Sequence, residues 1–369
     1  MKYALLPFFF LLFFFSAPAQ DFECGTVMPA GYAQTLQQRI AAHPAVRPAG
    51  GLIVIPVQVH LIRESSGNSV LTLQDIQTEL DCVNVFYANA GLIFFECQAA
   101  EMIDDDDLYD YLSTTEQSIL INNHYVTNVL NLYFANTVST SSGPVCGYSW
   151  LPPSGYDACF VAASCAINGS SLAHEIGHYF GLPHTHGGTP DELVNGSNCA
   201  TEGDYICDTP ADPGLSGLVN SSCVYTGTAT DANNMAYQPD VTNIMSYSRK
   251  SCRTSFTPMQ YAIINATYFS DRYYLSCLST GISSIRLPSI TLFPNPAQDR
   301  LHLSGIPSGD ETLLITLYDI SGRIVLSAAI LPGKSDAEIA LNGLEDGTYL
   351  CTISGAAGRV FTDRVVVRR

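Results

Sequence analysis

The sequence is short of positive charge and of long apolar runs. It has 16 lysines and arginines against 34 aspartates and glutamates, which gives a formal net charge of -18 at pH 7. This excess of negative charge repels phosphate backbones, so we expect no nucleic acid partner. Only residues 5–15 form a long Leu/Phe-rich run, and a membrane-spanning helix needs about 20 apolar residues. We therefore expect no membrane span in the mature protein.

The N-terminus has the pattern of a secretory signal peptide. Lys2 precedes the apolar run, and Ala17-Pro18-Ala19 is a small-x-small cleavage signature. We expect residues 1–19 to be removed by cleavage near Ala19 or Gln20. A membrane anchor is the alternative, and the shortness of the run argues against it. The 12 cysteines fit the same destination, because disulfides persist outside the cytosol.

The most informative motif runs from His174 to His184. His174 and His178 are four residues apart, so on a helix both imidazoles face one metal ion, and Glu175 can reach a water bound to it. Gly181 ends the helix and lets the chain turn, which delivers His184 as the third ligand. Three histidines leave one tetrahedral position open, as in catalytic zinc sites. The alternative is an amphipathic helix with incidental histidines; we expect His186 to be a loop histidine.

Other motifs narrow this pattern to a family. Asn243-Ile244-Met245-Ser246-Tyr247 resembles the methionine turn of metzincin metalloproteases. By that resemblance Met245 forms the floor of the site, and Tyr247 assists the metal or the transition state. Further motifs are shared with the pappalysin family and its ulilysin-like members, over about residues 50–280. These motifs are Gly203-Asp204-Tyr205-Ile206-Cys207-Asp208-Thr209-Pro210 and Phe256-Thr257-Pro258 with Gln260 after Cys252.

The resemblance implies a secreted zinc endopeptidase, made as a latent zymogen, that hydrolyses peptide bonds in proteins. Glu175 is then the general base, and zinc lowers the pKa of the attacking water. The alternative is a catalytically dead metzincin scaffold that serves as a surface-displayed binding or adhesion protein. The presence of Glu175 argues against that alternative, because this carboxylate is not a zinc ligand.

Hydrophobic patterning divides the chain into parts. We expect a pro-segment over 20–49, a catalytic domain over 50–280, a linker over 281–290 and a C-terminal domain over 291–369. The predicted fold class is α+β, a metzincin catalytic domain with a twisted mixed sheet and an active-site helix, followed by a small all-β Ig-like sandwich. In the catalytic domain the patterns predict a helix over 73–86 and strands over 52–60, 92–97, 126–138 and 159–163. His60 is expected to be packed and hydrogen-bonded.

Cys24-Gly25-Thr26 resembles the cysteine switch of ulilysin-like zymogens. A thiolate is a good zinc ligand, so Cys24 can occupy the open position and displace the water. The alternative is an ordinary disulfide. Without Cys24 and Cys351, which lies in the C-terminal domain, ten cysteines remain, an even number for pairing within the catalytic domain.

The region after the zinc motif is expected to need cross-links and ions. The family resemblance implies two disulfides among four cysteines, with a pairing that the sequence does not give: Cys199, Cys207, Cys223 and Cys252. The resemblance also suggests calcium near Asp204, Asp208 and Thr209, whose oxygens are the hard ligands that calcium prefers. Turn-forming roles for these side chains are the alternative.

One position departs from the family pattern. Ulilysin-like enzymes carry an acidic residue just before the cysteine that follows the methionine turn, and it favours Arg or Lys after the scissile bond. Here that position is Ser251, preceded by Arg249 and Lys250. Because a neutral or basic pocket does not compensate a buried cation, we expect apolar or acidic residues to be accepted there.

After residue 290 the sequence alternates apolar and polar residues between turns. Phe293-Pro294-Asn295-Pro296, Tyr318-Asp319-Ile320-Ser321-Gly322-Arg323 and the basic C-terminus resemble the C-terminal sorting domain of the type IX secretion system. The resemblance implies export through the outer membrane by that machinery, removal of the domain, and a released or surface-attached product. The alternative is an accessory Ig-like binding module.

Overall fold

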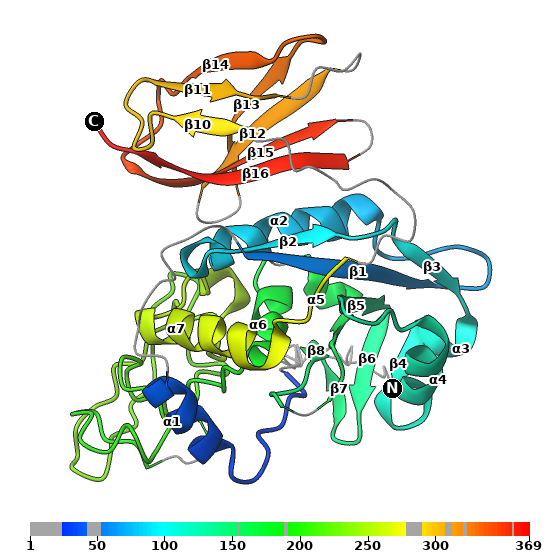
Figure 1. The fold of residues 1–369 in the computed structure, drawn as a ribbon. Helices are drawn as coiled ribbons and strands as arrows, with labels where there is room; N and C mark the ends of the chain where they lie inside the picture. The colour runs from blue at the N-terminus through cyan, green and yellow to red at the C-terminus, as the bar shows by residue number, and fades with distance from the viewer. Residues whose placement is uncertain are drawn as a thin grey trace, which may run out of the picture.

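The computed structural model describes residues 24–42, 53–153, 155–167, 169–187, 191–277, 290–306, 312–319, 323–355 and 358–369. The expected signal peptide lies outside the described residues, and so does the expected linker apart from Ile290. Among the helices that are described, none combines the length and the apolar character needed to cross a membrane. The buried apolar side chains of this part of the chain form four clusters, three in the first region of Figure 1 and one in the second, and none of the four joins the two regions.

The first region contains all of the described helices. They are α1 (Tyr32–Ala42), α2 (Leu73–Tyr87), η1 (Ala88–Ala90), α3 (Asp106–Tyr109), α4 (Ser113–His124), α5 (Ala163–Ala166), α6 (Ser171–Tyr179), η2 (Lys250–Cys252), α7 (Pro258–Thr267) and η3 (Tyr268–Arg272). Its strands are β1 (Ile53–Arg63), β2 (Leu92–Glu96), β3 (Glu101–Asp104), β4 (Asp110–Leu112), β5 (Leu130–Ala135), β6 (Thr137–Thr140), β7 (Gly143–Val145), β8 (Gly147–Tyr148) and β9 (Ala158–Ala162).

A mixed sheet organises this region, with strand order β2-β1-β5-β9-β8 and β3 paired to the other end of β1. Strands β1, β2, β3, β5 and β9 are parallel, whereas β8 runs antiparallel to β9 at the edge. The central strands are covered on both faces, so β1 and β5 are buried along almost their whole length. The edge position of β8 leaves one side of that strand available for another extended segment.

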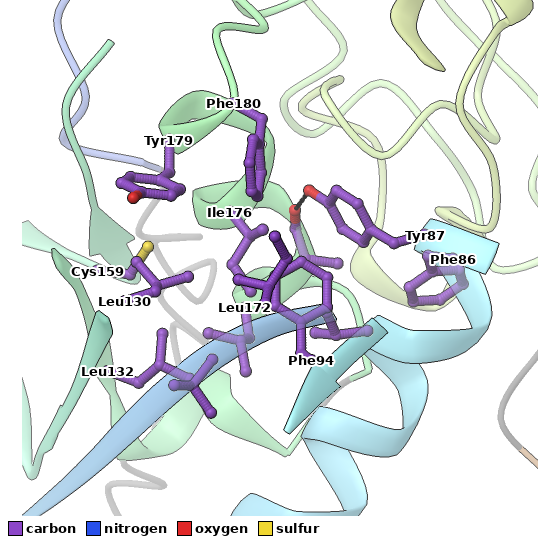
Figure 2. Close-up of a cluster of buried hydrophobic side chains, with 14 of the residues drawn as sticks. Phe86, Tyr87, Phe94, Leu130, Leu132, Cys159, Leu172, Ile176, Tyr179 and Phe180 are labelled. Atoms are coloured by element: carbon purple, nitrogen blue, oxygen red, sulfur yellow. Dashed lines mark hydrogen bonds between the residues drawn. The ribbon is translucent and has the colours of Figure 1, made fainter. Parts of the chain in front are cut away.

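Helices α2 and α6 pack on one face of the sheet. Figure 2 shows Tyr87 and Phe94 packed with Phe180, which follows α6, and the Tyr87 hydroxyl donates a hydrogen bond to the Ala173 carbonyl. The α2 helix begins at a capping box in which Thr72 and Asp75 satisfy each other's backbone amides. These contacts fix α6 against the sheet, so its polar residues are held in a rigid frame.

The chain between α6 and α7 is held together by disulfides. Among its described residues the only regular element is the short η2 turn, and a small apolar cluster of Leu215, Val219 and Cys252 is the local core. The pairs are Cys199–Cys207 and Cys223–Cys252, within the set of four that we expected. Cross-links here compensate for a core too small to order this long segment.

The second region is all β. Its strands are β10 (Thr291–Phe293), β11 (Arg300–Ser304), β12 (Leu313–Tyr318), β13 (Ile324–Ile330), β14 (Asp336–Ala340), β15 (Gly347–Gly355) and β16 (Gly358–Val367). They form a three-stranded sheet, β10-β11-β14, and a four-stranded antiparallel sheet, β13-β12-β15-β16. Side chains from both sheets fill one core, as in a sandwich. Figure 1 shows this region lying over α2, where the Tyr318 hydroxyl donates to Asp81.

The predicted fold class is confirmed, with local corrections. The strand expected over 126–138 begins only at Leu130, because the Asn131 side-chain amide binds the backbone N–H and C=O of Val126 and curls that stretch. Of the ten cysteines expected to pair, only eight do so. Cys97–Cys277 and Cys146–Cys165 are the other two of the four disulfides. Cys82 and Cys159 are instead buried thiols. His60 is buried beside Glu101 and Asn131, as predicted.

Candidate metal centre

Helix α6 and the turn after it bring three imidazoles together. The Nε2 atoms of His174 and His178 are 3.2 Å apart, and those of His178 and His184 are 3.0 Å apart. The helix ends at Tyr179, and Gly181 adopts a positive φ of 90°, a backbone conformation that disfavours other residues. The turn predicted from the sequence is therefore present, and it carries His184 back beside the helix.

Backbone carbonyls orient two of these rings. His174 Nδ1 lies 2.7 Å from the Ile244 carbonyl oxygen, and His178 Nδ1 lies 2.7 Å from that of Leu182. Each Nδ1–H therefore donates outward, which leaves Nε2 unprotonated and facing its neighbours. Burial, reinforced by the neighbouring imidazoles and the charge of Arg253, lowers the pKa of His174 and His184 well below the ordinary value, and burial lowers that of His178 to about 3. All three rings are neutral, the form that binds metals.

The spacing of these nitrogens fits a metal ion. Zn–N bonds of about 2.0–2.1 Å in a tetrahedral site place two nitrogens roughly 3.4 Å apart. Unprotonated nitrogens at the observed 3.0 and 3.2 Å repel each other through their lone pairs, and a cation between them removes that repulsion. In the described part of the chain, the four residues Cys24, His174, His178 and His184 form the only group of at least three candidate ligands, with one donor atom from each within 4.8 Å of the others.

Cys24 reaches this group from the N-terminal segment. Its Sγ lies 3.3 Å from Glu175 Oε2 and accepts a hydrogen bond of 3.2 Å from the Thr26 amide. Burial, with the nearby Glu175, raises the pKa of the Cys24 thiol well above its usual value in the absence of a cation. No disulfide involves this cysteine. The structure therefore disfavours the alternative of an ordinary disulfide and puts the sulfur beside the three imidazoles.

The residues around Cys24 lie along the edge strand β8. The Gly25 amide donates to the Gly147 carbonyl at 2.8 Å, and the Ser149 amide donates to Thr26 Oγ1 at 2.9 Å. Gly147 is closely packed within the catalytic region, since a Cβ there would lie 2.6 Å from the Phe160 carbonyl oxygen and 3.1 Å from a Glu175 carboxylate oxygen. An extended segment thus covers Glu175 by adding to the sheet.

Glu175 is 1 % exposed and lies at the centre of this closed arrangement. Burial raises the pKa of Glu175 to about 8, and hydrogen bonds from Cys24 and Thr26 together with the Arg253 charge moderate the rise. Such a raised pKa is a common property of carboxyl groups that take and give protons near neutral pH. Its place next to His174 on α6 is the one that the sequence motif predicted.

Met245 packs against α6, and Tyr247 lies beside the imidazoles. Met245 is fully buried, and its Sδ packs so tightly on Gly177 of α6 that a Cβ there would be 2.4 Å away. The ring of Tyr247 is centred 4.7 Å from that of His184, and its hydroxyl donates to the Cys24 carbonyl at 3.3 Å. His186 stacks on His184 with centroids 5.0 Å apart, but it does not join the ligand group.

Ser170 links the start of helix α6 to the η2 turn. It occupies the N-cap position of α6, but its hydroxyl makes no capping bond and donates instead to the Lys250 carbonyl at 3.0 Å. That bond ties the start of the helix to η2, the turn that contains Ser251. Ser251 itself is exposed on this turn.

The expected calcium ligands do not gather as a set. Asp204 is fully buried and accepts from Thr209 Oγ1 and the Ile206 amide, each at 2.9 Å. Asp208 instead accepts from Thr257 Oγ1 at 2.7 Å and the Met259 amide at 2.8 Å, at the N-terminus of α7. For Asp208 the structure favours the structural alternative.

Several residues near the centre escaped the sequence analysis. Gly147 and Ser149 hold the N-terminal segment in place, and Arg253 is a buried cation whose charge lowers the pKa of His174, His184 and Glu175. Glu192 is buried, and its Oε2 finds no hydrogen-bond partner in the described part of the chain. None of the four belongs to a spaced motif, so only the fold could bring them to notice.

Comparison with known proteins gives two family matches. Residues 113–267 match the model of the pregnancy-associated plasma protein-A family of peptidases, and residues 291–368 match that of secretion system C-terminal sorting domains. An extracellular metalloprotease of Pyricularia oryzae is 27% identical over 271 residues, covering 67% of this chain and 89% of the relative. One from Verticillium alfalfae is 28% identical over 269 residues, covering 68% and 91%. A Tannerella forsythia promirolysin mutant structure is 17% identical, with a TM-score of 0.47 and coverage of 69% and 96%.

Residues 113–267 therefore belong to the pappalysin family of metalloproteases, and residues 291–368 form a type IX secretion sorting domain. The recognition made from the sequence motifs is confirmed. The protein is a metalloprotease that is secreted or attached to the cell surface.

The contact between Gly177 and Met245 yields a prediction. A Gly177→Ala substitution favours the helix by about 1 kcal/mol through backbone propensity, but overpacking costs about 1–3 kcal/mol. Because the added Cβ meets Met245 Sδ at 2.4 Å, we expect the second effect to dominate, with a lower unfolding midpoint and weaker zinc retention. Thermal unfolding and metal analysis after dialysis measure the two effects. A more stable variant with full zinc would show that Met245 moves aside freely.

Proposed function

We propose that this protein is a zinc-dependent endopeptidase, made as a latent zymogen, that hydrolyses proteins outside the cell. The observation that carries the proposal is the convergence of three neutral imidazole nitrogens beside a buried carboxyl group and one reachable thiol. The pappalysin family match and the extracellular metalloprotease relatives support it.

The donor set favours zinc. Nitrogen donors from His174, His178 and His184, with sulfur from Cys24 in the latent form, are the ligands that zinc takes in four-coordinate sites. When bound, zinc lowers the pKa of a water molecule and polarises the scissile carbonyl. The outward Nδ1 bonds of His174 and His178 to backbone carbonyls hold the rings in the required orientation.

Glu175 and Tyr247 carry the proton and charge steps in this proposal. The Glu175 carboxylate takes a proton from the water that attacks the scissile carbonyl carbon, and it then delivers that proton to the leaving amine nitrogen. The Tyr247 hydroxyl donates to the Cys24 carbonyl in the latent form, and once Cys24 has moved away it can donate to the developing negative charge on the substrate's carbonyl oxygen.

The substrate backbone takes the place of the N-terminal segment in this scheme. Gly25 and Thr26 are hydrogen-bonded to Gly147 and Ser149 along β8, and an extended peptide has the same backbone groups to offer. The site should discriminate between substrate side chains after the scissile bond. The η2 turn carries Ser251 in place of an acidic residue, and the buried Arg253 adds positive charge nearby. Both features favour apolar or acidic residues after the scissile bond.

We also propose a calcium ion bound by the carboxylates of Glu192 and Asp204. Thr209 would hold Asp204 in place through its hydroxyl, and Asp208 would not be a ligand. The Glu192 side chain packs on Gly203, the residue that precedes Asp204 in the sequence. A Cβ at Gly203 would lie 2.0 Å from Glu192 Oε2. Burial raises the pKa of both carboxyl groups, that of Glu192 to about 7, and repulsion between neighbouring carboxylates adds to the rise. A hard dication removes that repulsion and satisfies the unpartnered oxygen.

The domain division follows the sequence boundaries: residues 1–19 as signal peptide, 20–49 as pro-segment, 50–280 as catalytic domain, 281–290 as linker and 291–369 as sorting domain. The two separate cores, which end at Leu275 and begin at Ile290, support the last boundary. In this proposal the sorting domain engages the type IX machinery and is then removed.

The proposed chemistry requires Glu175. In protein freed of residues 20–49, we expect Glu175→Gln to lower kcat/KM on casein or gelatin by at least about 100-fold, the usual loss when a general base is removed. Zinc content should stay unchanged, because Glu175 is not a ligand. Glu345→Gln, an exposed carboxylate in the sorting domain, is the matched control. Full zinc without Glu175-dependent cleavage would favour a binding protein instead.

Latency is expected to depend on the Cys24 thiol. A Cys24→Ala precursor should cleave a small peptide substrate at least about tenfold faster than the intact precursor, because alanine cannot ligate zinc. Cys82→Ala removes a buried thiol outside the ligand group and should leave the precursor latent. The switch would be ruled out by a Cys24→Ala precursor as inactive as the parent.

Cleavage-site profiling with a peptide library tests the specificity. We expect apolar or acidic residues after the scissile bond to be cut at least as well as arginine, and Ser251→Asp to shift the profile toward arginine and lysine, because the new carboxylate pairs with them. A parent profile dominated by arginine would contradict this expectation.

The calcium proposal predicts a linked gain in stability. Calcium at about 100 times its Kd should stabilise the full chain by about 2.7 kcal/mol, seen as a higher unfolding midpoint. Glu192→Gln should abolish that gain, whereas Asp191→Asn, at the exposed neighbouring position, should keep most of it. Equal midpoints with calcium and with EGTA in the parent protein would eliminate the site.

A further inference from the structure

Helix α1, within the proposed pro-segment, is built into the catalytic region. Figure 1 shows α1 beside α7, and the two helices are in contact. Leu36 is fully buried and Tyr32 is 3% exposed, and both belong to the same hydrophobic core as the sheet and α6. Gln34 and Gln38 lie on the exposed face. A helix with this much buried surface has a substantial affinity of its own for the catalytic region.

Polar contacts add specificity to this packing. Arg39 Nη2 lies 2.8 Å from Asp271 Oδ2, with the two side chains only 7% and 18% exposed, and Arg39 Nη1 donates to the Tyr32 hydroxyl at 3.1 Å. The Tyr32 hydroxyl in turn donates to the Gly181 carbonyl at 2.7 Å, and Gln37 Nε2 donates to the Tyr205 carbonyl at 2.8 Å. Arg39 and Asp271 are therefore a largely buried ion pair, and loss of one partner leaves an uncompensated charge.

These contacts are separate from the metal centre. None of them involves His174, His178 or His184, and the chain between Thr26 and Tyr32 is largely exposed, with Val27 at 80%. The N-terminal segment thus holds the catalytic region at two places, one at the edge strand and one at α7. A short connection between two anchors makes binding of the second one intramolecular.

We propose that α1 is a second, metal-independent anchor, and that the pro-segment stays bound as a noncovalent inhibitor after the chain between α1 and β1 has been cut. The surface beside α7 and Gly181 is its binding site, and the occupant is the chain's own α1. This inference rests on the proposed latency, which it extends: a cut after α1 leaves both anchors in place, so activation also requires the severed segment to dissociate.

The test uses the full chain with a specific protease site placed between α1 and β1. After cleavage, we expect the N-terminal fragment to co-elute with the remainder in gel filtration, with and without EDTA, and the zinc-loaded protein to remain latent. Arg39→Ala and Asp271→Asn, which break the ion pair from opposite sides, should each reduce the retained fraction at least tenfold. Gln38→Ala, on the exposed face of the same helix, should retain the fragment like the parent.

Thermal unfolding of each uncut variant shows that it is folded before cleavage. The proposal is overturned if the parent fragment separates on cleavage, if EDTA alone releases it, or if Arg39→Ala and Gln38→Ala behave alike. Co-elution does not require peptidase activity, so it tests α1 independently of catalysis. A cut Cys24→Ala chain should keep its fragment; retention together with undiminished latency would contradict the cysteine switch and leave the α1 anchor standing.

Discussion

The structure depends on holding three unprotonated imidazole nitrogens about one point. Such nitrogens repel each other at 3.0–3.2 Å, and rings in solution would turn away or take up protons. Here the rings are buried, two are tied through Nδ1 to backbone carbonyls, and α6 is packed against the sheet. The free energy that orders this arrangement comes from the hydrophobic core, and a cation relieves the repulsion that remains.

Glycines allow backbone and side chains to approach this point from several directions. Gly177 admits the Met245 sulfur against α6, Gly181 reverses the chain before His184, and Gly147 leaves room for the Phe160 carbonyl and the Glu175 carboxyl group. In each case a Cβ would clash with a neighbouring atom. The close packing of the centre therefore requires glycine at these three positions. In the proposed zymogen, Cys24 closes the site along the same edge strand on which we propose that the substrate binds, so latency and catalysis would share one surface.

Stability is distributed unevenly around this centre. The sheet and α6 form a continuous core, whereas the segment between α6 and α7 depends on two disulfides and a small apolar cluster. The methionine turn lies at the end of that segment, so the cross-links help to keep Met245 packed against Gly177 of α6. The sorting domain has its own core and meets the catalytic region at α2, through the bond of Tyr318 to Asp81.

The sequence by itself determined the ligand helix, its glycine stop, the methionine turn and the two-region architecture. These features are local, because helical spacing, turn conformation and alternating hydrophobicity are set by neighbours in the chain. Only the tertiary structure decided which cysteines pair, that the Ser170 hydroxyl bonds to η2, that Asp208 accepts hydrogen bonds at the N-terminus of α7, and that α1 joins the core through Arg39 and Asp271. Those contacts join residues far apart in sequence, and their energy depends on burial and distance, which exist only once the chain has folded.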